Sequence, residues 1–425
     1  MKTLGLFLAV IILACPVYAQ KTMTIDVDKV LQRCETDISI HQLFRAKEKL
    51  ARAKYEKAKK WWWPTLYGGV KMDGLLGTTQ NSDGRFFRDV AKHHLWTGIG
   101  INAQWDLKEK YNVRASAYEE RSQQYASKAA VEDRSIQAVE HYYHWMHAIT
   151  AFDAYNALIA KASDIAAQFN LQVQGGLKPQ SDYLMAKSRV KMMEVKALTY
   201  YRISKEEEAQ LVSMLGWDAG TQIEPLDSVF LPLNLVNLQP PNWDADIKND
   251  PKILLRKIEI ESLQAQRDRF TKGRWLPRLY INSNGSLFGG TFNPFDPTGI
   301  FQVGAVWKLP LHQLKGNVDL QVTDAKINTL ESTLPLLREE RQNQVMQAYY
   351  DIQSEEQSLL IAEAARDYAW EAYQMIEKRQ KNGVAQPLAL FQAQENAVQT
   401  TLDYIKIVAE FNAAQYRYLI LTKAN

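Results

Sequence analysis

Three histidines within two turns of a predicted helix form the densest group of side chains that could do chemistry. His141, His144 and His147 are three of the seven histidines in the chain. Successive members stand three residues apart and share a helix face, so the spacing allows a metal site. The side chains nevertheless spread over about 120° of the helix surface, and only Glu140 adds a ligand type nearby. Polar histidines on a helix wall are the alternative, and we predict no metal.

No other pattern in the chain indicates catalysis. We find no nucleophile–base constellation, no phosphate-binding loop and no Cys/His metal pattern, so the sequence predicts neither an enzyme nor a cofactor. The balance of 51 basic and 48 acidic residues implies no strongly basic face, which argues against a nucleic-acid partner. Cys34 fits a small buried residue in a helix better than a reactive thiol.

The first nineteen residues read as a targeting segment. Lys2 precedes an apolar stretch, and Val17 and Ala19 place small residues where a signal peptidase cuts before Gln20. Processing as a lipoprotein at Cys15 is the alternative, although Pro16 follows it directly. Either route takes the mature chain out of the cytoplasm.

The rest of the chain repeats itself. A W-x-P-x-L-Y motif begins at Trp62 and returns at Trp275, and the pair Tyr142-Tyr143 and Gly176 return at a common spacing as Tyr349-Tyr350 and Gly383. A repeat of this length organises the whole fold. It divides the mature chain into repeat 1 at 20–225, a linker or equatorial segment at 226–245, and repeat 2 at 246–425.

Each repeat predicts two strands followed by a long helix and a returning helix. Alternating apolar residues place strands at about 64–73 and 97–107, and again at about 277–287 and 300–310, with exposed loops at 73–93 and 282–298. No Gly or Pro occurs from Lys108 to Gln174, so one helix of roughly 100 Å is expected there. The expected helices are 108–174 and 180–214 in repeat 1, and 317–382 and 388–422 in repeat 2.

Four such strands fit a membrane-spanning barrel shared between chains. After the signal segment no run of about 18 apolar residues appears, and a closed barrel needs about eight strands or more. Three chains would supply twelve strands, and the long amphipathic helices would continue the barrel as a helical tube. Aromatic residues at the predicted strand ends match an interfacial girdle, with a soluble β-core as the alternative. They are Trp61, Trp62, Trp63, Trp96, Trp105, Trp275 and Trp307.

Taken together, the repeat, the x-P-x-L strand openings, the long helices and the glycine turns resemble the TolC-like outer-membrane efflux proteins. The resemblance covers essentially the whole mature chain. It implies a mainly α fold with a membrane β-barrel: internally duplicated long-helix hairpins and four strands per chain, forming a trimeric twelve-stranded barrel continued by a periplasmic α-helical barrel. It also implies a homotrimer in outer-membrane lipid that works with a periplasmic membrane-fusion adaptor and an inner-membrane transporter.

The same resemblance assigns candidate sites to the turns between the helices. Gly176, Leu177, Gly383 and Val384 would contact the adaptor, or would simply cap helices. Asp182 would place three carboxylates near the axis and favour cations, or would complement a helix dipole. The positions that correspond to it in repeat 2 are Ala389 and Gln392, so the acidic ring of some family members is absent. Lys381 nearby would favour anions instead, or would simply belong to a solvated basic helix end.

The sequence therefore predicts a passive exit duct in the outer membrane of a Gram-negative bacterium, extending into the periplasm, within a tripartite efflux or type I secretion system. One alternative is a periplasmic coiled-coil or adaptor protein that never inserts, which explains the helices but not four alternating strands with aromatic ends. A diffusion porin would need many more strands and far less helix.

Overall fold

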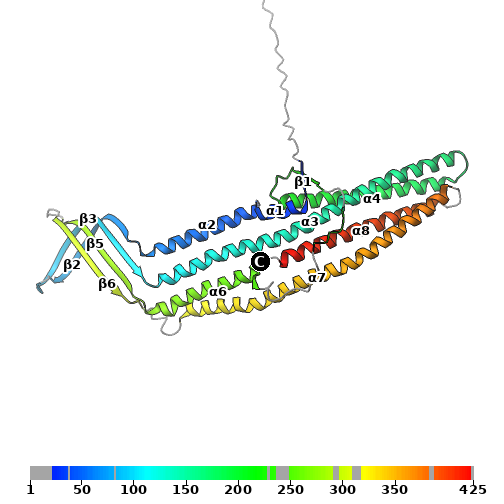
Figure 1. The fold of residues 1–425 in the computed structure, drawn as a ribbon. Coiled ribbons are helices and arrows are strands. Elements are labelled where there is room, and N and C mark those ends of the chain that lie inside the picture. Colours follow the sequence, from blue (N-terminus) through cyan, green and yellow to red (C-terminus); the bar gives the residue numbers. More distant parts are fainter. Residues whose placement is uncertain are drawn as a thin grey trace, which may run out of the picture. The chain divides into compact units, whose positions relative to one another are not determined.

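The computed structural model of the chain describes residues 22–36, 39–80, 83–226, 230–235, 248–290, 296–308, 317–381 and 387–422 (Figure 1). Several predictions fall outside these residues. They are the signal peptide at 1–19 with Cys15, the turn residues Gly383 and Val384, and most of the linker at 226–245.

The chain folds as two compact units. Unit 1 comprises Met1–Ser39, Val131–Pro241 and Val345–Lys423, and unit 2 comprises Ile40–Ala130, Asn242–Gln344 and Ala424–Asn425. Each unit draws on both halves of the sequence. The units are therefore a different division from the two sequence repeats, and the division at 226–245 stays a prediction.

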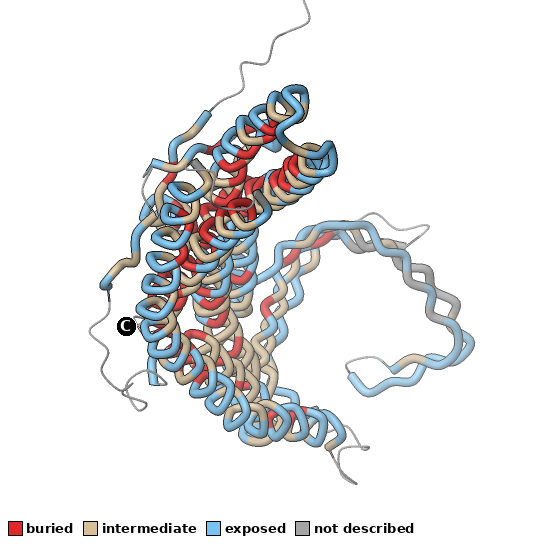
Figure 2. The backbone as a smooth tube through the Cα atoms, turned by 90° about the vertical axis from the view of Figure 1, so that its right-hand side faces the viewer, coloured by how far each residue is buried: buried red, intermediate tan, exposed pale blue. Residues whose placement is uncertain are grey.

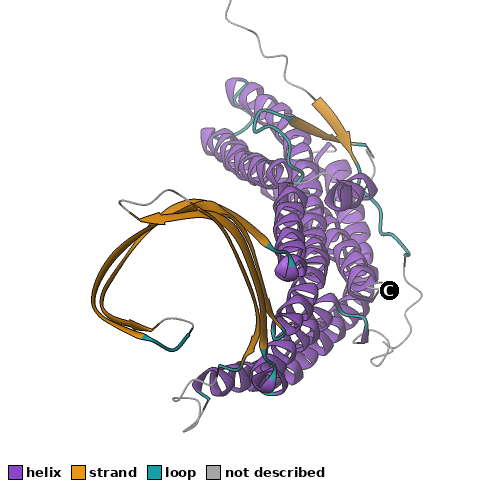
Figure 3. Ribbon diagram, turned by 90° about the vertical axis from the view of Figure 1, so that its left-hand side faces the viewer, coloured by secondary structure: helices purple, strands orange, loops and turns teal. Residues whose placement is uncertain are grey.

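Unit 2 contains a four-stranded antiparallel sheet with the order β2-β3-β5-β6. Consecutive strands are neighbours, and Figure 3 shows the sheet bent into an arc. The strands are β2 (Thr65–Gln80), β3 (Phe86–Asp106), β5 (Arg278–Gly290) and β6 (Asp296–Val306).

The first hairpin is longer than the sequence predicts. The expected loop at 73–93 is mostly strand, since β2 and β3 stay paired from Thr65 opposite Asn102 to Gln80 opposite Phe86. The Gly and Asp residues that suggested a loop instead serve a bulge and a tight end: Gly77 has a φ of 111° beside a register shift, and Gly84 has a φ of 84°. Likewise, the expected loop at 282–298 begins with strand, because β5 reaches Gly290 and β6 starts at Asp296.

Helices that enter the sheet in unit 2 end in a short 3-10 turn followed by proline. Pro64 and Pro277 stand just before β2 and β5, where a proline blocks further helix and sets an extended conformation. The elements are α2 (Ser39–Lys59), η1 (Lys60–Trp62), α6 (Pro251–Phe270) and η2 (Lys272–Trp275).

A buried ion pair fixes the start of α6. Asp250 caps the helix by accepting the Ile253 N–H at 2.9 Å. The other Asp250 oxygen lies 2.9 Å from Nε of Arg341 on α7, and both side chains are almost wholly buried. Removal of either partner would leave an uncompensated buried charge, so this pair ties α6 to α7 within unit 2.

Long helices dominate unit 1. The predicted helices correspond closely to the observed ones, because no Gly or Pro interrupts 108–174 and an amphipathic stripe runs along each helix. Helices α3 and α7 contribute residues to both units. The helices are α1 (Val27–Thr36), α3 (Glu109–Gln174), α4 (Gln180–Met214), α7 (Val318–Lys381) and α8 (Pro387–Thr422).

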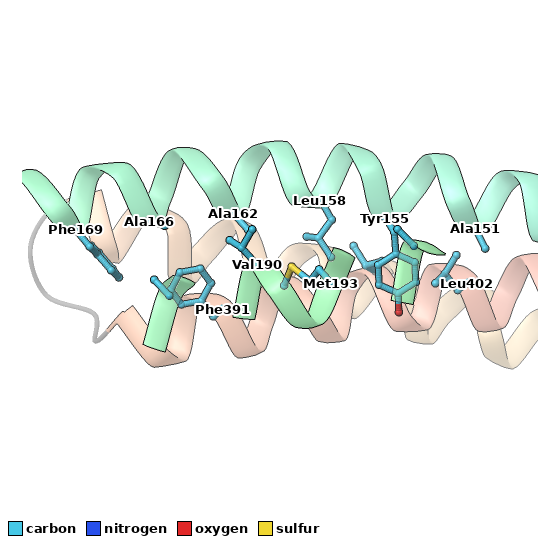
Figure 4. Packing of buried hydrophobic residues seen from close by; sticks show 13 residues of the cluster. Ala151, Tyr155, Leu158, Ala162, Ala166, Phe169, Val190, Met193, Phe391 and Leu402 are labelled. Carbon is cyan, nitrogen blue, oxygen red and sulfur yellow. The ribbon is translucent and has the colours of Figure 1, made fainter. Parts of the chain in front are cut away.

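A continuous apolar core joins α3, α4 and α8 of unit 1. Side chains spaced three, four or seven residues apart on α3 face α4 and α8 (Figure 4), the spacing of a helix stripe. Phe169 and Phe391 meet edge-to-face with ring centroids 5.9 Å apart, and Tyr155 stacks on Tyr200 at 5.6 Å. Figure 2 shows that buried residues concentrate along the helices, whereas the strands are largely exposed.

Unit 1 also holds a small parallel sheet. β1 (Thr22–Ile25) pairs with β4 (Gln222–Pro225), which brings the first described residues beside the segment that follows α4. Among the helices of the described residues, none combines the length and the apolar character needed to cross a membrane.

Candidate functional site

The sheet of unit 2 has one apolar and one polar face. Strand alternation places Leu66 opposite Ile101 and Ile281 opposite Val303 on the apolar face. On the polar face Asn102 stands opposite Asn282. Six of the apolar side chains on this face are open to solvent in the single chain: Leu66 is 73% exposed, Val70 70%, Met72 71%, Ile99 68%, Phe301 71% and Val303 68%.

The polar face carries one tyrosine over a glycine in each hairpin. Tyr67 stands opposite Gly100, and Tyr280 stands opposite Gly304. A Cβ at Gly100 or Gly304 would lie 2.6 Å from the tyrosine ring, so only glycine leaves room for the ring at these places. The Tyr67 hydroxyl donates a hydrogen bond to Asn282 Oδ1 at 2.9 Å. Both tyrosines close the W-x-P-x-L-Y motif, so the sequence repeat is also a repeat of packing.

The polar face is crowded at Gly98, Gly100 and Gly304 but open at Gly69, and we interpret it as the inner side of the curved sheet. A Cβ at Gly98 would lie 2.3 Å from the Gly285 carbonyl oxygen, whereas a Cβ at Gly285, on the apolar face, would meet nothing within 4 Å. Side chains converge on the concave side of a bent sheet and spread apart on the convex side. The apolar face is therefore the outer, convex one, and the polar face lines the inside of the arc.

Tryptophans gather at the end of this sheet where the strands join the helices. The Trp105 indole N–H donates to the Trp62 carbonyl oxygen at 2.7 Å, which joins the end of β3 to the entry of β2. Trp61 is half-buried, and Trp62, Trp63, Trp275 and Trp307 are 53%, 61%, 67% and 60% exposed. The side chain of Trp96, within β3, lies outside the described residues.

The turn after α3 is a complete Schellman cap. Gly176 has a φ of 72°, its N–H donates to Val173 O at 3.0 Å, and the Leu177 N–H donates to Gln172 O at 2.8 Å. Gly176 is thus required for the turn itself. Leu177 is 79% exposed, so its side chain stays open for a contact outside the chain.

The predicted aperture residues lie at the starts of α4 and α8. Asp182 is half-buried in the first turn of α4, where a carboxylate complements the helix dipole. Ala389 and Gln392 lie in the first two turns of α8, and Gln392 is exposed. Lys381 ends α7, and its side chain lies outside the described residues. Their grouping around an aperture stays a prediction.

The three histidines lie in different surroundings in the structure. His141 Nδ1 lies 2.6 Å from Glu207 Oε2 on α4, His144 is exposed, and His147 packs edge-on against Tyr200. Burial, reinforced by the charges of His144 and Lys406, lowers the pKa of His147 to about 4. Within the described residues no group of three metal-ligating side chains comes together.

Ion pairs join helices of unit 1 that are distant in sequence, and the sequence did not predict them. Arg189 of α4 lies 2.5 Å from Glu395 of α8, and Lys196 reaches the same carboxylate at 3.1 Å. Arg417 of α8 contacts both Glu140 of α3 and Asp351 of α7. No local pattern signals such pairs, because the partners are far apart in sequence and each reads as an ordinary charged helix residue.

Two buried amides on α8 hold the extended segment 230–235. Asn412 accepts the Leu233 N–H at 2.8 Å and donates to Leu231 O at 3.0 Å. Gln415 accepts the Leu235 N–H at 2.8 Å and donates to Leu233 O at 2.8 Å. The two side chains thus replace a neighbouring strand and satisfy a backbone that has no sheet around it.

Cys34 is fully buried. Burial raises the pKa of its thiol to about 11, against the opposing charge of Arg134. A thiol of this kind is inert at neutral pH, as the sequence predicts.

No model of a protein family matches the chain. A search of curated protein sequences found no match either.

Solved structures, in contrast, share the fold over nearly its whole length. The CmeC outer membrane channel of Campylobacter jejuni is 12% identical, with 94% of this chain and 85% of that chain covered at a TM-score of 0.80. The outer membrane protein VceC of Vibrio cholerae is 13% identical, with 93% and 96% covered at 0.74. The open-state MtrE outer membrane channel of Neisseria gonorrhoeae is 12% identical, with 94% and 89% covered at 0.75. The chain therefore has the TolC-like fold that the sequence analysis expects.

Proposed function

We propose that this chain is the outer-membrane exit channel of an efflux system. Three copies would close a twelve-stranded barrel in the membrane, and their helices would continue it as a tunnel through the periplasm. The observation that carries the proposal is the exposed apolar outer face of the sheet. A contiguous apolar surface of this kind marks an interaction site, and hydrocarbon is the surrounding in which side chains such as Val303 and Phe301 are stable.

The free edges of the sheet support a barrel shared between chains. In the described residues β2 pairs only with β3, and β6 pairs only with β5. Because the four strands alternate in direction, β6 of one copy would run antiparallel to β2 of the next. An unpaired edge as long as β2 invites association, and closure with neighbouring copies would remove every edge.

Exposed seams on the helices of unit 1 support the same assembly. On α4 Met185, Met192 and Val195 are 48%, 58% and 64% exposed. On α7 Ile361, Tyr368 and Met375 are 72%, 71% and 53% exposed and stand seven residues apart. Apolar residues at heptad spacing pack into a facing helix. We infer that the seam of α4 in one copy packs against the seam of α7 in the next.

The names of the similar structures fit this function. Three of them are called outer membrane channels: CmeC, OprN and MtrE. We propose that the chain likewise works with a periplasmic membrane-fusion adaptor and an inner-membrane pump, and acts as a passive duct rather than an enzyme. Leu177 with the turn at Gly383 and Val384 would meet the adaptor, and Asp182, Lys381, Ala389 and Gln392 would line the aperture.

The mass of the assembled protein tests the proposal. Outer membranes would be isolated, extracted with detergent and examined by native mass spectrometry. We expect a complex of three mature chains in the outer-membrane fraction, lacking residues 1–19. A monomer released without detergent would refute the shared barrel and favour the periplasmic coiled-coil alternative.

Single-channel recording tests the aperture. We expect Asp182→Asn to lower the preference for cations in a planar bilayer, because it removes one carboxylate from each chain near the axis. Asp153→Asn, on the body of α3, is the matched control. An unchanged ion selectivity and conductance in Asp182→Asn would remove Asp182 from the aperture.

A further inference from the structure

Both 3-10 turns that lead into the sheet carry a cation beside a tryptophan. In η1 the Lys60 ammonium lies 5.9 Å from the centroid of the Trp63 ring. In η2 the Arg274 guanidinium lies 5.5 Å from the centroid of the Trp275 ring. These distances are within the range of cation–π attraction. The two turns occupy equivalent places in the repeat, so the arrangement occurs twice in each chain.

The other two junctions between sheet and helix add cations at the same end of the sheet. Lys108 and Lys110 follow the end of β3, and Lys308 follows the end of β6. The register places these ends side by side, since Asp106 pairs with Arg278 and Arg278 pairs with Val306. We call the set of Lys60, Lys108, Lys110, Arg274 and Lys308 the basic rim.

Four acids at this end of the sheet are already paired with other cations. Glu56 lies 3.3 Å from Lys59, Asp268 lies 2.9 Å from Lys272, Asp106 lies 3.1 Å from Arg278 and Glu109 lies 2.5 Å from Arg269. Over the described part of the chain, no acid forms an ion pair with a member of the basic rim. The Arg274 Nε–H is moreover shielded from solvent without a hydrogen-bond partner. The helix-side end of the sheet thus carries a net positive charge.

We propose that the basic rim binds the phosphate of anionic phospholipid headgroups in the membrane leaflet nearest the helices. The exposed tryptophans beside it suit the boundary between hydrocarbon and headgroups, and the apolar outer face of the sheet continues directly from them. Lysine and arginine at this depth attract anionic lipids. Three copies would repeat the rim around the barrel. The inference rests on the proposed function.

Lipid retention on the purified full-length complex tests this inference. The complex would be exchanged into detergent micelles with equal amounts of phosphatidylglycerol and phosphatidylcholine, and the bound lipids would be counted by native mass spectrometry. The wild type should retain phosphatidylglycerol at least about 10-fold over phosphatidylcholine at low salt, and the preference should shrink at high salt. Equal retention of the two lipids by the wild type would overturn the inference.

Substitutions assign the preference to the rim. K60Q/R274Q/K308Q should lose most of it, whereas the charge-preserving K60R/R274K/K308R should keep it. The matched control R45Q/K49Q/R338Q removes three exposed cations elsewhere in unit 2 and should also keep it. Full preference in K60Q/R274Q/K308Q, or an equal loss in the control, would overturn the inference.

Failure of the proposed function gives a different result from failure of the inference. If the chain is not a membrane channel, no trimer enters the outer-membrane fraction and the lipid assay has no assembled complex to report on. A trimer that inserts and conducts but retains both lipids equally refutes the basic rim alone.

Discussion

The sheet of unit 2 and the helical core of unit 1 use apolar residues in opposite ways. In the core Phe169, Leu402 and Ala162 are almost wholly buried against one another. In the sheet Val303, Phe301 and Leu66 are about two-thirds or more exposed, and the face turned inward is polar. The helical core supplies its own apolar surroundings, whereas the sheet requires them from outside the chain.

Exposed apolar side chains are informative only when their positions in the fold are considered with them. Single exposed apolar side chains are ordinary on any protein surface. The sheet differs because its most exposed aliphatic and aromatic side chains, such as Leu66, Phe301 and Val303, lie at alternating strand positions on one face, the convex one. A fold in water would reverse this pattern and place the apolar residues on the crowded concave side.

The largest effect should come from a charge on the outer face of the sheet. We expect Val303→Arg to abolish assembly in the outer membrane, because arginine near the middle of a bilayer costs about 2–4 kcal/mol in each chain. The measurement is the amount of trimer in the outer-membrane fraction. Gln302→Arg, one residue away on the inner face, should assemble normally. Equal assembly of both variants would break the contrast between the two faces.

The next largest effect should come from a cavity in the helical core. Leu402→Ala should lower the free energy of unfolding by about 2–5 kcal/mol, since Leu402 is 1% exposed within the core of α3, α4 and α8. Chemical denaturation in detergent measures it. Leu171→Ala, at a position 68% exposed on α3, should change it by less than about 0.5 kcal/mol. Comparable losses at both positions would show that α3 buries its apolar residues elsewhere.

The inner face of the sheet should tolerate added atoms only where it is open. Gly100→Ala should cost about 1–3 kcal/mol, because the new methyl group would lie 2.6 Å from the Tyr67 ring. Gly69→Ala on β2 is the matched control, as its Cβ would meet nothing within 4 Å. The measurement is the temperature at which the trimer dissociates. A neutral Gly100→Ala would show that Tyr67 does not pack over this glycine.

The smallest effect concerns the half-buried His147 of unit 1. The folded chain keeps His147 neutral, with a pKa lowered from 6.5 to about 4, so the unfolded chain binds its proton first as the pH falls. Stability is therefore full above about pH 6.5 and declines between 6.5 and 4, by about 1 kcal/mol at pH 5.5.

Denaturation of unit 1 at pH 7.5 and 5.5 measures this decline. His147→Gln should flatten it, whereas His144→Gln, at an exposed position, should leave it as in the wild type. A pH dependence in His147→Gln equal to that of the wild type would assign the decline to other groups.

The long helices could be predicted from the sequence because their signal is local. An uninterrupted stretch such as 108–174, which ends at a glycine turn and carries a periodic stripe, leaves little choice of structure. The strands around 73–93 could not be bounded in this way. Gly77 and Gly84 suggest a loop when read alone, and only the pairing of β2 with β3 turns the segment into a bulged hairpin.

The candidate sites differ in the same way, since some depend on local sequence and others on contacts between distant segments. The cap at Gly176 follows from local turn chemistry and is present in the structure. The cross-helix contacts of Arg417 and Glu395, and the amides of Asn412 and Gln415, depend on which helices become neighbours. That information is spread over the whole chain, so no short motif contains it.

Cysteine labelling of the two sheet faces directly tests whether the apolar face lies in the membrane. Cys34 is buried with a thiol pKa of about 11, so it adds little background. In isolated outer membranes, a water-soluble maleimide should modify Gln302→Cys on the inner face and leave Val303→Cys unmodified in the lipid. Rapid modification of both positions would contradict a membrane-embedded outer face and, with it, the proposed channel.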